Sequence, residues 1–166
     1  SLSGLKIRVT PIYEPFVRVL DGIPVTMAPG EVYIALERGV VDGFGWPSIG
    51  VSDLGWQEAV KYIIGPGFYQ TDVCVLFNLN SWKRLDEKTR NLLIGVMEKV
   101  ERESYELSQE MAKKEREFLV GKGLKFIEFK GKEGKEYLDK AFRSGWDRVI
   151  AKSPVTGNKL REMMEK

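Results

Sequence analysis

The sequence contains no histidine and only one cysteine among its 166 residues. The lack of histidine removes the commonest general base and the commonest protein ligand of metal ions. A single cysteine, Cys74, cannot form an intrachain disulfide, so cysteine usage does not decide the redox compartment. Cys74 lies in the apolar run DVCVLF, which predicts a buried and unreactive thiol. No metal site is predicted.

The common catalytic and nucleotide-binding motifs are also missing. The chain has no GxxxxGK[ST] phosphate loop, no GxGxxG and no GxSxG. Acidic residues are frequent on the expected helices, but their spacing singles out no acid–base pair. No apolar run approaches the ~18 residues that a membrane-spanning helix needs. These absences do not exclude an enzyme, but they leave no residue to be named as catalytic; we expect a protein that is not an enzyme and needs no cofactor.

The composition that is present indicates one globular α/β domain with a real core. Apolar residues make up 43% of the chain, which argues against disorder. The 26 basic residues nearly balance the 24 acidic ones, which argues against a nucleic-acid-binding face. The lysines of KGKEGKEYLDK alternate with Glu133, Glu136 and Asp139, as on a solvated helix surface.

Strand and helix patterns alternate over the first part of the chain. Leu5, Ile7 and Val9 alternate with polar residues and predict a strand that ends before Pro11. The order then continues as helix, strand, helix and strand, over residues 13–22, 23–27, 29–39 and 40–44. A β-α-β-α-β order predicts a largely parallel sheet. Ligands of such sheets bind beyond the carboxyl ends of the strands.

One very long helix is predicted from Asp86 to about Gly121. At 1.5 Å per residue its ~36 residues measure ~54 Å, more than the ~35–40 Å width of a compact domain of this size. Ser104 and Lys114 interrupt the apolar seam, so a helix that bridges two lobes fits better than a coiled coil; pairing of two copies through this helix remains open. The other expected elements are a strand or helix-to-strand passage at 59–64, a long strand at 68–80, a helical turn at 81–85, a strand at 124–129 and two helices separated around Pro154. The predicted domains are an α/β ligand-binding lobe (1–85), the long helix (86–122), and a returning strand with C-terminal helices (123–166).

Arg8 is the first candidate binding residue. It lies near the carboxyl end of the first strand, on the face opposite Leu5, Ile7 and Val9. An exposed arginine in a surface ion pair is one interpretation. The other is a guanidinium that holds a carboxylate with two parallel hydrogen bonds, which a lysine cannot do.

Aromatic residues in three loops are further candidates. Phe44 and Trp46 lie in VDGFGWPSIG, where they are either core anchors or pocket walls. Phe68 and Tyr69 follow the turn GPG and either begin a strand or contact a ligand. Tyr13 follows the first strand, where ordinary helix-start chemistry is the alternative.

Several of these segments together resemble the DctP family, the solute-binding proteins of tripartite ATP-independent periplasmic (TRAP) transporters. The matching segments are GLKIRV, PVTM, EVYIALERGVVDG and the late GLKFIEF, and the resemblance covers the whole chain. The positions that carry it most strongly are Gly4, Leu5, Lys6, Arg8, Pro24, Met27, Glu31, Tyr33, Ala35, Leu36, Gly39, Val41, Asp42 and Gly43.

This resemblance implies a periplasmic-binding-protein-like fold of the type II-like class, of which this chain is the second lobe. Family members are about twice as long, so the first lobe is expected to precede Ser1. The family arginine that Arg8 matches forms a salt bridge with the ligand carboxylate. The implied function is to capture an organic acid outside the cytoplasm, in the periplasm, and to deliver it to the membrane permease subunits.

Departures from the family pattern bear on the ligand. Trp46 replaces a ligand-binding amide, Pro29 stands where an aromatic pocket residue is frequent, and Phe68 falls near a polar contact of some relatives. A more apolar pocket follows, suited to a hydrophobic or aromatic carboxylate or a 2-oxo acid. Two other functions stay open at this point, a cytoplasmic ligand-sensing effector domain of a regulator and an enzyme domain with its catalytic groups elsewhere.

Overall fold

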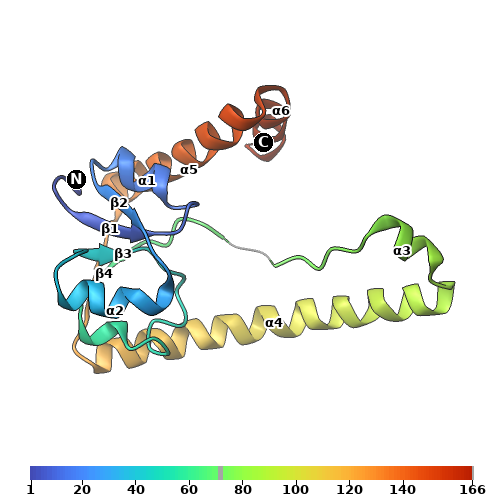
Figure 1. The fold of residues 1–166 in the computed structure, drawn as a ribbon, viewed down its shortest axis with the longest axis horizontal. Coiled ribbons are helices and arrows are strands. Elements are labelled where there is room, and N and C mark those ends of the chain that lie inside the picture. Colours follow the sequence, from blue (N-terminus) through green and yellow to red (C-terminus); the bar gives the residue numbers. More distant parts are fainter. Residues whose placement is uncertain (71–72, 166) are drawn as a thin grey trace. The chain divides into compact units, whose positions relative to one another are not determined.

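The computed structural model describes residues 1–70 and 73–165. It divides into two compact units, residues 1–69 with 115–166 and residues 70–114, which are treated separately below. The elements in chain order are β1 (Lys6–Val9), α1 (Glu14–Val19), β2 (Ile23–Thr26), α2 (Pro29–Glu37), β3 (Gly43–Phe44), the 3-10 helix η1 (Trp56–Glu58), β4 (Tyr62–Gly65), α3 (Leu79–Arg84), α4 (Glu87–Gly121), β5 (Lys125–Glu128), α5 (Gly131–Lys152) and α6 (Pro154–Met164) (Figure 1).

The first unit is built on parallel strands, as the alternation of strands and helices predicts. Its main sheet has the order β2-β1-β3, and all pairs are parallel. The register places Arg8 of β1 opposite Val25 on one side and opposite Phe44 on the other. A second, two-stranded parallel sheet joins β4 to β5. The mixed α/β class with parallel sheets and one long helix is therefore confirmed.

Two sets of apolar side chains form the core of this unit, one on each side of β1. Figure 1 shows α1 and α5 on one side of this strand and α2 on the other. On the α2 side, a buried cluster is formed by Val32, Val51, Trp56, Leu119 and Leu124. On the α1 side, the rings of Phe16, Phe68 and Tyr137 contact one another. Because β1 has packed layers on both faces, the neighbouring side chains of Arg8 and Val9 are both buried.

Local sequence signals explain how α2 begins. Pro29 occupies the first turn, where a missing N–H costs nothing. The carboxylate of Glu31 accepts a hydrogen bond from the backbone N–H of Ala28 at 3.0 Å, which satisfies one of the free donors at the helix start. The helix start at Pro29 matches the prediction from the sequence.

The long helix is present as α4, with 35 residues from Glu87 to Gly121. Its last turns belong to the first unit, where Leu119 is buried in the core cluster. Glu115 is also buried, and its carboxylate accepts hydrogen bonds from the backbone N–H of Ser52 at 2.8 Å and from the Ser52 hydroxyl. These bonds fix the loop that follows Trp46 to the end of α4. Within the described residues, no helix combines the length and apolar character needed to cross a membrane.

The second unit, residues 70–114, holds α3 and the larger part of α4. Asn78 caps α3 by accepting hydrogen bonds from the N–H groups of Asn80 and Ser81 at 3.0 and 3.1 Å. The prediction of a strand over 68–80 is wrong for residues 68–70 and 73–80. These residues form no strand, and α3 begins at Leu79. Thr71 and Asp72 lie outside the described residues. The prediction that the Cys74 thiol is buried is wrong as well, because Cys74 is exposed.

The failure of that strand has a physical reason. An apolar β-prone run becomes a strand only when another backbone supplies hydrogen bonds along its edge. No strand in the described part of the chain pairs with residues 73–78. Val73 and Leu76 remain 92% and 90% exposed, so this run is apolar by composition without being part of a core.

Candidate functional site

The side chain of Arg8 is buried inside the first unit, with only 2% of its surface exposed. Its Nε and Nη2 atoms donate to the carbonyl oxygen of Met27 at 3.3 and 3.0 Å. Its Nη1 atom lies 3.5 Å from the carbonyl oxygen of Gly45 and donates to it weakly. The interpretation of Arg8 as an exposed arginine in a surface ion pair is therefore wrong.

No acidic side chain of the described residues forms an ion pair with Arg8. The ion pairs of these residues all join positions four apart along the chain, and none includes Arg8. Desolvation by burial lowers the pKa of the Arg8 guanidinium from its ordinary value. A buried cation is costly unless an anion and hydrogen bonds compensate for the lost water. The two carbonyl oxygens accept from Nε, Nη1 and Nη2, which leaves two of the five N–H groups of the guanidinium without a hydrogen bond among the described residues.

Two tryptophan rings form one wall beside the guanidinium. The Cζ atom of Arg8 lies 5.2 Å from the ring centroid of Trp46 and 5.9 Å from that of Trp56. The two indoles meet edge to face, with centroids 4.8 Å apart. Phe44 packs against Trp56 from another side, also at 4.8 Å. The negative faces of aromatic rings attract a cation, so this wall stabilises the buried charge in part.

Two tyrosines form a second wall. Gly45 lies against the ring of Tyr13, because a Cβ atom at that glycine would be only 3.1 Å from the Tyr13 Cδ2 atom. The ring of Tyr13 stacks on that of Tyr69, with centroids 6.2 Å apart and an angle of 18° between the planes. Burial raises the pKa of the Tyr13 phenol, whereas the neighbouring charge of Arg8 lowers it. The Tyr13 phenol and the Arg8 guanidinium therefore interact electrostatically.

The structure brings most of the predicted site residues into one region. Arg8, Trp46 and Tyr13 are neighbours, and Tyr69 stacks on Tyr13. Phe44 and Phe68 stand behind these side chains, Phe44 against Trp56 and Phe68 edge-on to Tyr13 at 5.9 Å.

Pro29 is the outlying member of the predicted set. It is exposed in the first turn of α2, two residues after Met27, whose carbonyl oxygen Arg8 contacts. Binding roles for all seven residues remain predictions.

Sequence reasoning missed two features of the site. The carbonyl oxygens of Met27 and Gly45 hold the guanidinium, and backbone acceptors leave no trace in residue type. The ring of Trp56 is only 1% exposed. Its position as a single large aromatic residue in a turn-rich segment was a signal from which a buried ring could have been predicted. Outside this set, the amide oxygen of Gln57 is buried and has no hydrogen-bond partner within the described residues.

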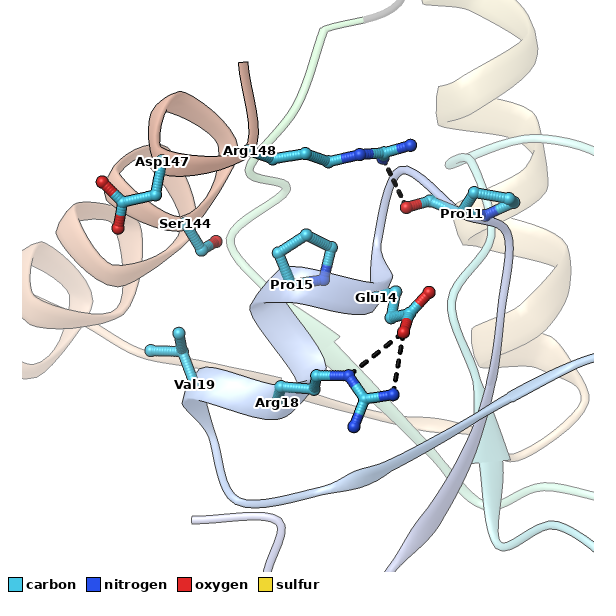
Figure 2. A pocket seen from close by; sticks show the side chains of 8 residues that line it. All are labelled: Pro11, Glu14, Pro15, Arg18, Val19, Ser144, Asp147 and Arg148. Carbon is cyan, nitrogen blue, oxygen red and sulfur yellow. Dashed lines mark hydrogen bonds and ion pairs between the residues drawn. The ribbon is translucent and has the colours of Figure 1, made fainter. Parts of the chain in front are cut away.

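A surface cavity of about 390 Å³ lies between α1 and α5, and Figure 2 shows the side chains around it. It does not include Arg8. The guanidinium of Arg18 is held by the carboxylate of Glu14 at 3.1 and 2.8 Å, so this pair is satisfied within α1. The cavity is lined by Pro11, Glu14, Pro15, Arg18, Val19, Ser144, Asp147 and Arg148.

Comparison with known sequences identifies relatives of the chain. It is 34% identical over 98 residues to a monocarboxylate 2-oxoacid-binding periplasmic protein of Nostoc sp., a match that covers 55% of this chain and 26% of that protein. It is 29% identical over 149 residues to the C4-dicarboxylate-binding periplasmic protein DctP of Rhodobacter capsulatus, covering 89% of this chain and 42% of that protein. The chain thus spans less than half the length of these curated relatives.

Solved structures share the fold. A TRAP periplasmic solute-binding protein of Desulfovibrio salexigens, determined with bound orotic acid, aligns with a TM-score of 0.80 at 19% identity, over 99% of this chain and 53% of that one. A TRAP periplasmic solute-binding protein of Haemophilus influenzae, determined with bound L-gulonate, aligns with a TM-score of 0.75 at 20% identity, over 99% and 54%. At these identities the alignments show the fold, which is that of periplasmic binding proteins.

The family model for bacterial extracellular solute-binding proteins, family 7 (DctP), matches residues 1–153. This match includes all the residues placed around Arg8 and every strand of the fold. The chain belongs to the DctP family of bacterial extracellular solute-binding proteins.

Proposed function

We propose that this chain forms one wall of a two-lobed cleft in an extracytoplasmic receptor. In this proposal, the receptor captures a small organic acid by its carboxylate and delivers it to the membrane subunits of a TRAP-type transporter. Arg8 supplies the charge that holds the carboxylate, and the aromatic rings around it supply the shape. Capture by such receptors needs a ligand that binds the closed state more tightly than the open state.

The buried guanidinium of Arg8 is the observation that carries this proposal. It has no carboxylate partner among the described residues, and only two backbone carbonyl oxygens accept its hydrogen bonds. A ligand carboxylate would supply the missing negative charge and accept two hydrogen bonds in the planar geometry that a guanidinium favours. It would also compensate for the desolvation that burial imposes on this side chain.

The relatives support an acid as the ligand, and the walls narrow its chemistry. The names of two relatives refer to a monocarboxylate 2-oxoacid and to C4-dicarboxylates, and two structural neighbours hold orotic acid and L-gulonate. Beside Arg8 this chain presents Trp46, Trp56 and Tyr13. Such rings favour planar or apolar groups over polyhydroxylated ones. We therefore propose an apolar or aromatic carboxylate, or a 2-oxo acid, as the ligand.

Variants of Arg8 test the proposed function in the full-length protein. Titration with pyruvate, benzoate, orotate and succinate, followed by calorimetry and thermal unfolding, should identify at least one acid that binds and stabilises the fold. Arg8→Ala should weaken that acid's binding by roughly 30-fold or more, because truncating one partner of a buried charge pair costs about 2–5 kcal/mol. Arg8→Lys should recover only part of the loss, because lysine lacks the planar pair of donors.

Arg38→Ala is the matched control, since Arg38 is exposed at the end of α2. It should leave the affinity unchanged. An Arg8→Ala protein that folds and binds the same acid with wild-type affinity would refute the role of Arg8.

For the long helix α4 we propose a second contact, with another copy of the chain. The helix is amphipathic, and several of its apolar side chains in the second unit are exposed, including Leu92 at 65% and Leu107 at 56%. Burying such a stripe against the same stripe of a second copy would remove it from water. Sedimentation of the full-length protein should show a dimer that Leu92→Glu with Leu107→Glu converts to a monomer. A wild-type monomer at high protein concentration would contradict this proposal.

A further inference from the structure

One face of α5 contacts two of the segments that carry the aromatic side chains beside Arg8. Ala141, Ser144, Gly145 and Arg148 are spaced three, four and seven residues apart, which places them on the same side of a helix. Ala141 and Ser144 are buried, at 0% and 3% exposure. The chain that follows the turn at Gly65 meets this face at Tyr69, and the loop between β1 and α1 meets it at Pro11.

The contact with Tyr69 is close. The phenol of Tyr69 donates a hydrogen bond to the carbonyl oxygen of Ala141 at 3.1 Å, and the Ser144 hydroxyl donates to the same oxygen at 2.8 Å. Gly145 provides the space for the phenol, because a Cβ atom there would lie 3.2 Å from the Tyr69 oxygen. The position of the Tyr69 ring is therefore determined by α5.

The contact with the β1–α1 loop is made by Arg148. Figure 2 shows its side chain reaching from α5 to the loop, where the guanidinium donates a hydrogen bond to the carbonyl oxygen of Pro11. Pro11 lies inside the turn that the Tyr13 N–H closes on the carbonyl oxygen of Thr10 at 3.0 Å. Holding Pro11 therefore holds the turn that presents Tyr13 to Arg8 and to Tyr69.

We propose that α5 sets the stacked Tyr13–Tyr69 pair beside Arg8, and that Arg148 acts as a positioning residue for this wall of the binding site. Only the description of the place as a binding site rests on the proposed function. Arg148 has no described contact with Arg8. It acts on the wall through its hydrogen bond to the carbonyl oxygen of Pro11. Its loss should release Tyr13 from Tyr69 while the charge of Arg8 stays in place.

Nuclear magnetic resonance of the full-length protein with labelled tyrosine tests this without any ligand. The wild type should show Overhauser contacts between the Tyr13 and Tyr69 rings, assigned with Tyr13→Phe and Tyr69→Phe. Arg148→Met keeps the aliphatic stem but removes the donor. It should lose those contacts and move the raised pKa of Tyr13 toward its ordinary value. Arg148→Lys keeps a cationic donor group and should keep most of the Overhauser contacts between the two rings.

The control is Arg143→Met, because Arg143 is an exposed arginine on the same helix. Gly145→Ala provides a second route, since the added methyl group displaces the Tyr69 phenol; it carries the test if Arg148→Met does not fold. The proposal is overturned if the Tyr13–Tyr69 ring contacts stay intact in Arg148→Met or, where that variant does not fold, in Gly145→Ala. It is also overturned if Arg143→Met loses these contacts to the same extent as Arg148→Met. A failure to find any bound acid would contradict the proposed function but not this positioning role.

Discussion

At the residue scale, strand alternation separated Arg8 from Leu5, Ile7 and Val9, but it could not decide whether the arginine was exposed. The decisive contacts come from Met27 and Gly45, which are 19 and 37 residues away in the chain. Whether an arginine faces water or a packed layer depends on what covers the strand. For this chain, helices cover both sides of β1, and the arginine is enclosed.

Tyr137 gives a prediction for stability at alkaline pH. Burial raises the pKa of its phenol to about 12, whereas the phenol of an unfolded tyrosine has a pKa of about 10. Below pH ~10 the phenol is neutral in both states and its contribution to stability is complete. Above that pH the unfolded state loses its proton first, so stability should fall as the pH approaches the folded value of about 12.

Denaturant unfolding at pH 9 and pH 11 would measure this effect. The wild type should lose more free energy of unfolding between these conditions than Tyr137→Phe, which has no titrating phenol. Tyr105→Phe serves as the control, because Tyr105 is 69% exposed, and it should behave as the wild type does. Identical losses for the wild type and Tyr137→Phe would rule out a buried phenol.

At the element scale, the helices and strands with strong local signals were predictable. The β-α-β-α-β order, the start of α2 at Pro29 and the length of α4 follow from periodicity and capping residues. The strand expected over 68–80 was wrong because pairing is a non-local property that composition cannot supply. The same limit explains the exposure of Cys74, since an apolar run is buried only where something packs on it.

Two helix glycines should respond in opposite ways to alanine. Gly95 lies inside α4, in the part nearer its start at Glu87, with open space where a Cβ atom would stand, so Gly95→Ala should stabilise the protein by about 0.5–1 kcal/mol. Gly157 of α6 packs on α5, and a Cβ atom there would be 2.9 Å from the backbone of Ile150. Gly157→Ala should therefore destabilise the protein, by about 1–3 kcal/mol.

Thermal unfolding of the two variants beside the wild type is the measurement. A lower midpoint for Gly95→Ala would contradict the open surface assigned to α4 at Gly95. An unchanged midpoint for Gly157→Ala would contradict the close packing of α6 on α5.

At the scale of the whole molecule, the resemblance to the DctP family was carried by short segments in the first third of the chain, and the family match over residues 1–153 confirms it. Most of the seven site residues could be proposed from sequence because they lie at strand ends or in the segments that follow them; Arg8 is in β1, Phe44 ends β3 and Pro29 begins α2. The proximity of most of them to one guanidinium could not, because it depends on contacts between distant parts of the chain, such as those of Arg8 with Met27 and Gly45. The missed Trp56 belongs to the same class of non-local contact.

The chain aligns with about half the length of its structural neighbours, at 53% and 54% of the two described above. A two-lobed receptor would enclose the ligand between this wall and a second one. The aromatic rings and Arg8 all belong to the first unit, so this wall is assembled within one compact body. Selectivity among acids should therefore follow Trp46 and Tyr13, with affinity for the carboxylate following Arg8.

A crystal structure of the full-length protein with its tightest-binding carboxylate would test the central claim most directly. The account predicts that both carboxylate oxygens lie about 2.7–2.9 Å from nitrogen atoms of Arg8, the distance of a charge-assisted hydrogen bond. It also predicts that the body of the ligand lies between the rings of Trp46 and Tyr13. A carboxylate bound elsewhere, with the Arg8 guanidinium held only by the carbonyl oxygens of Met27 and Gly45, would contradict it.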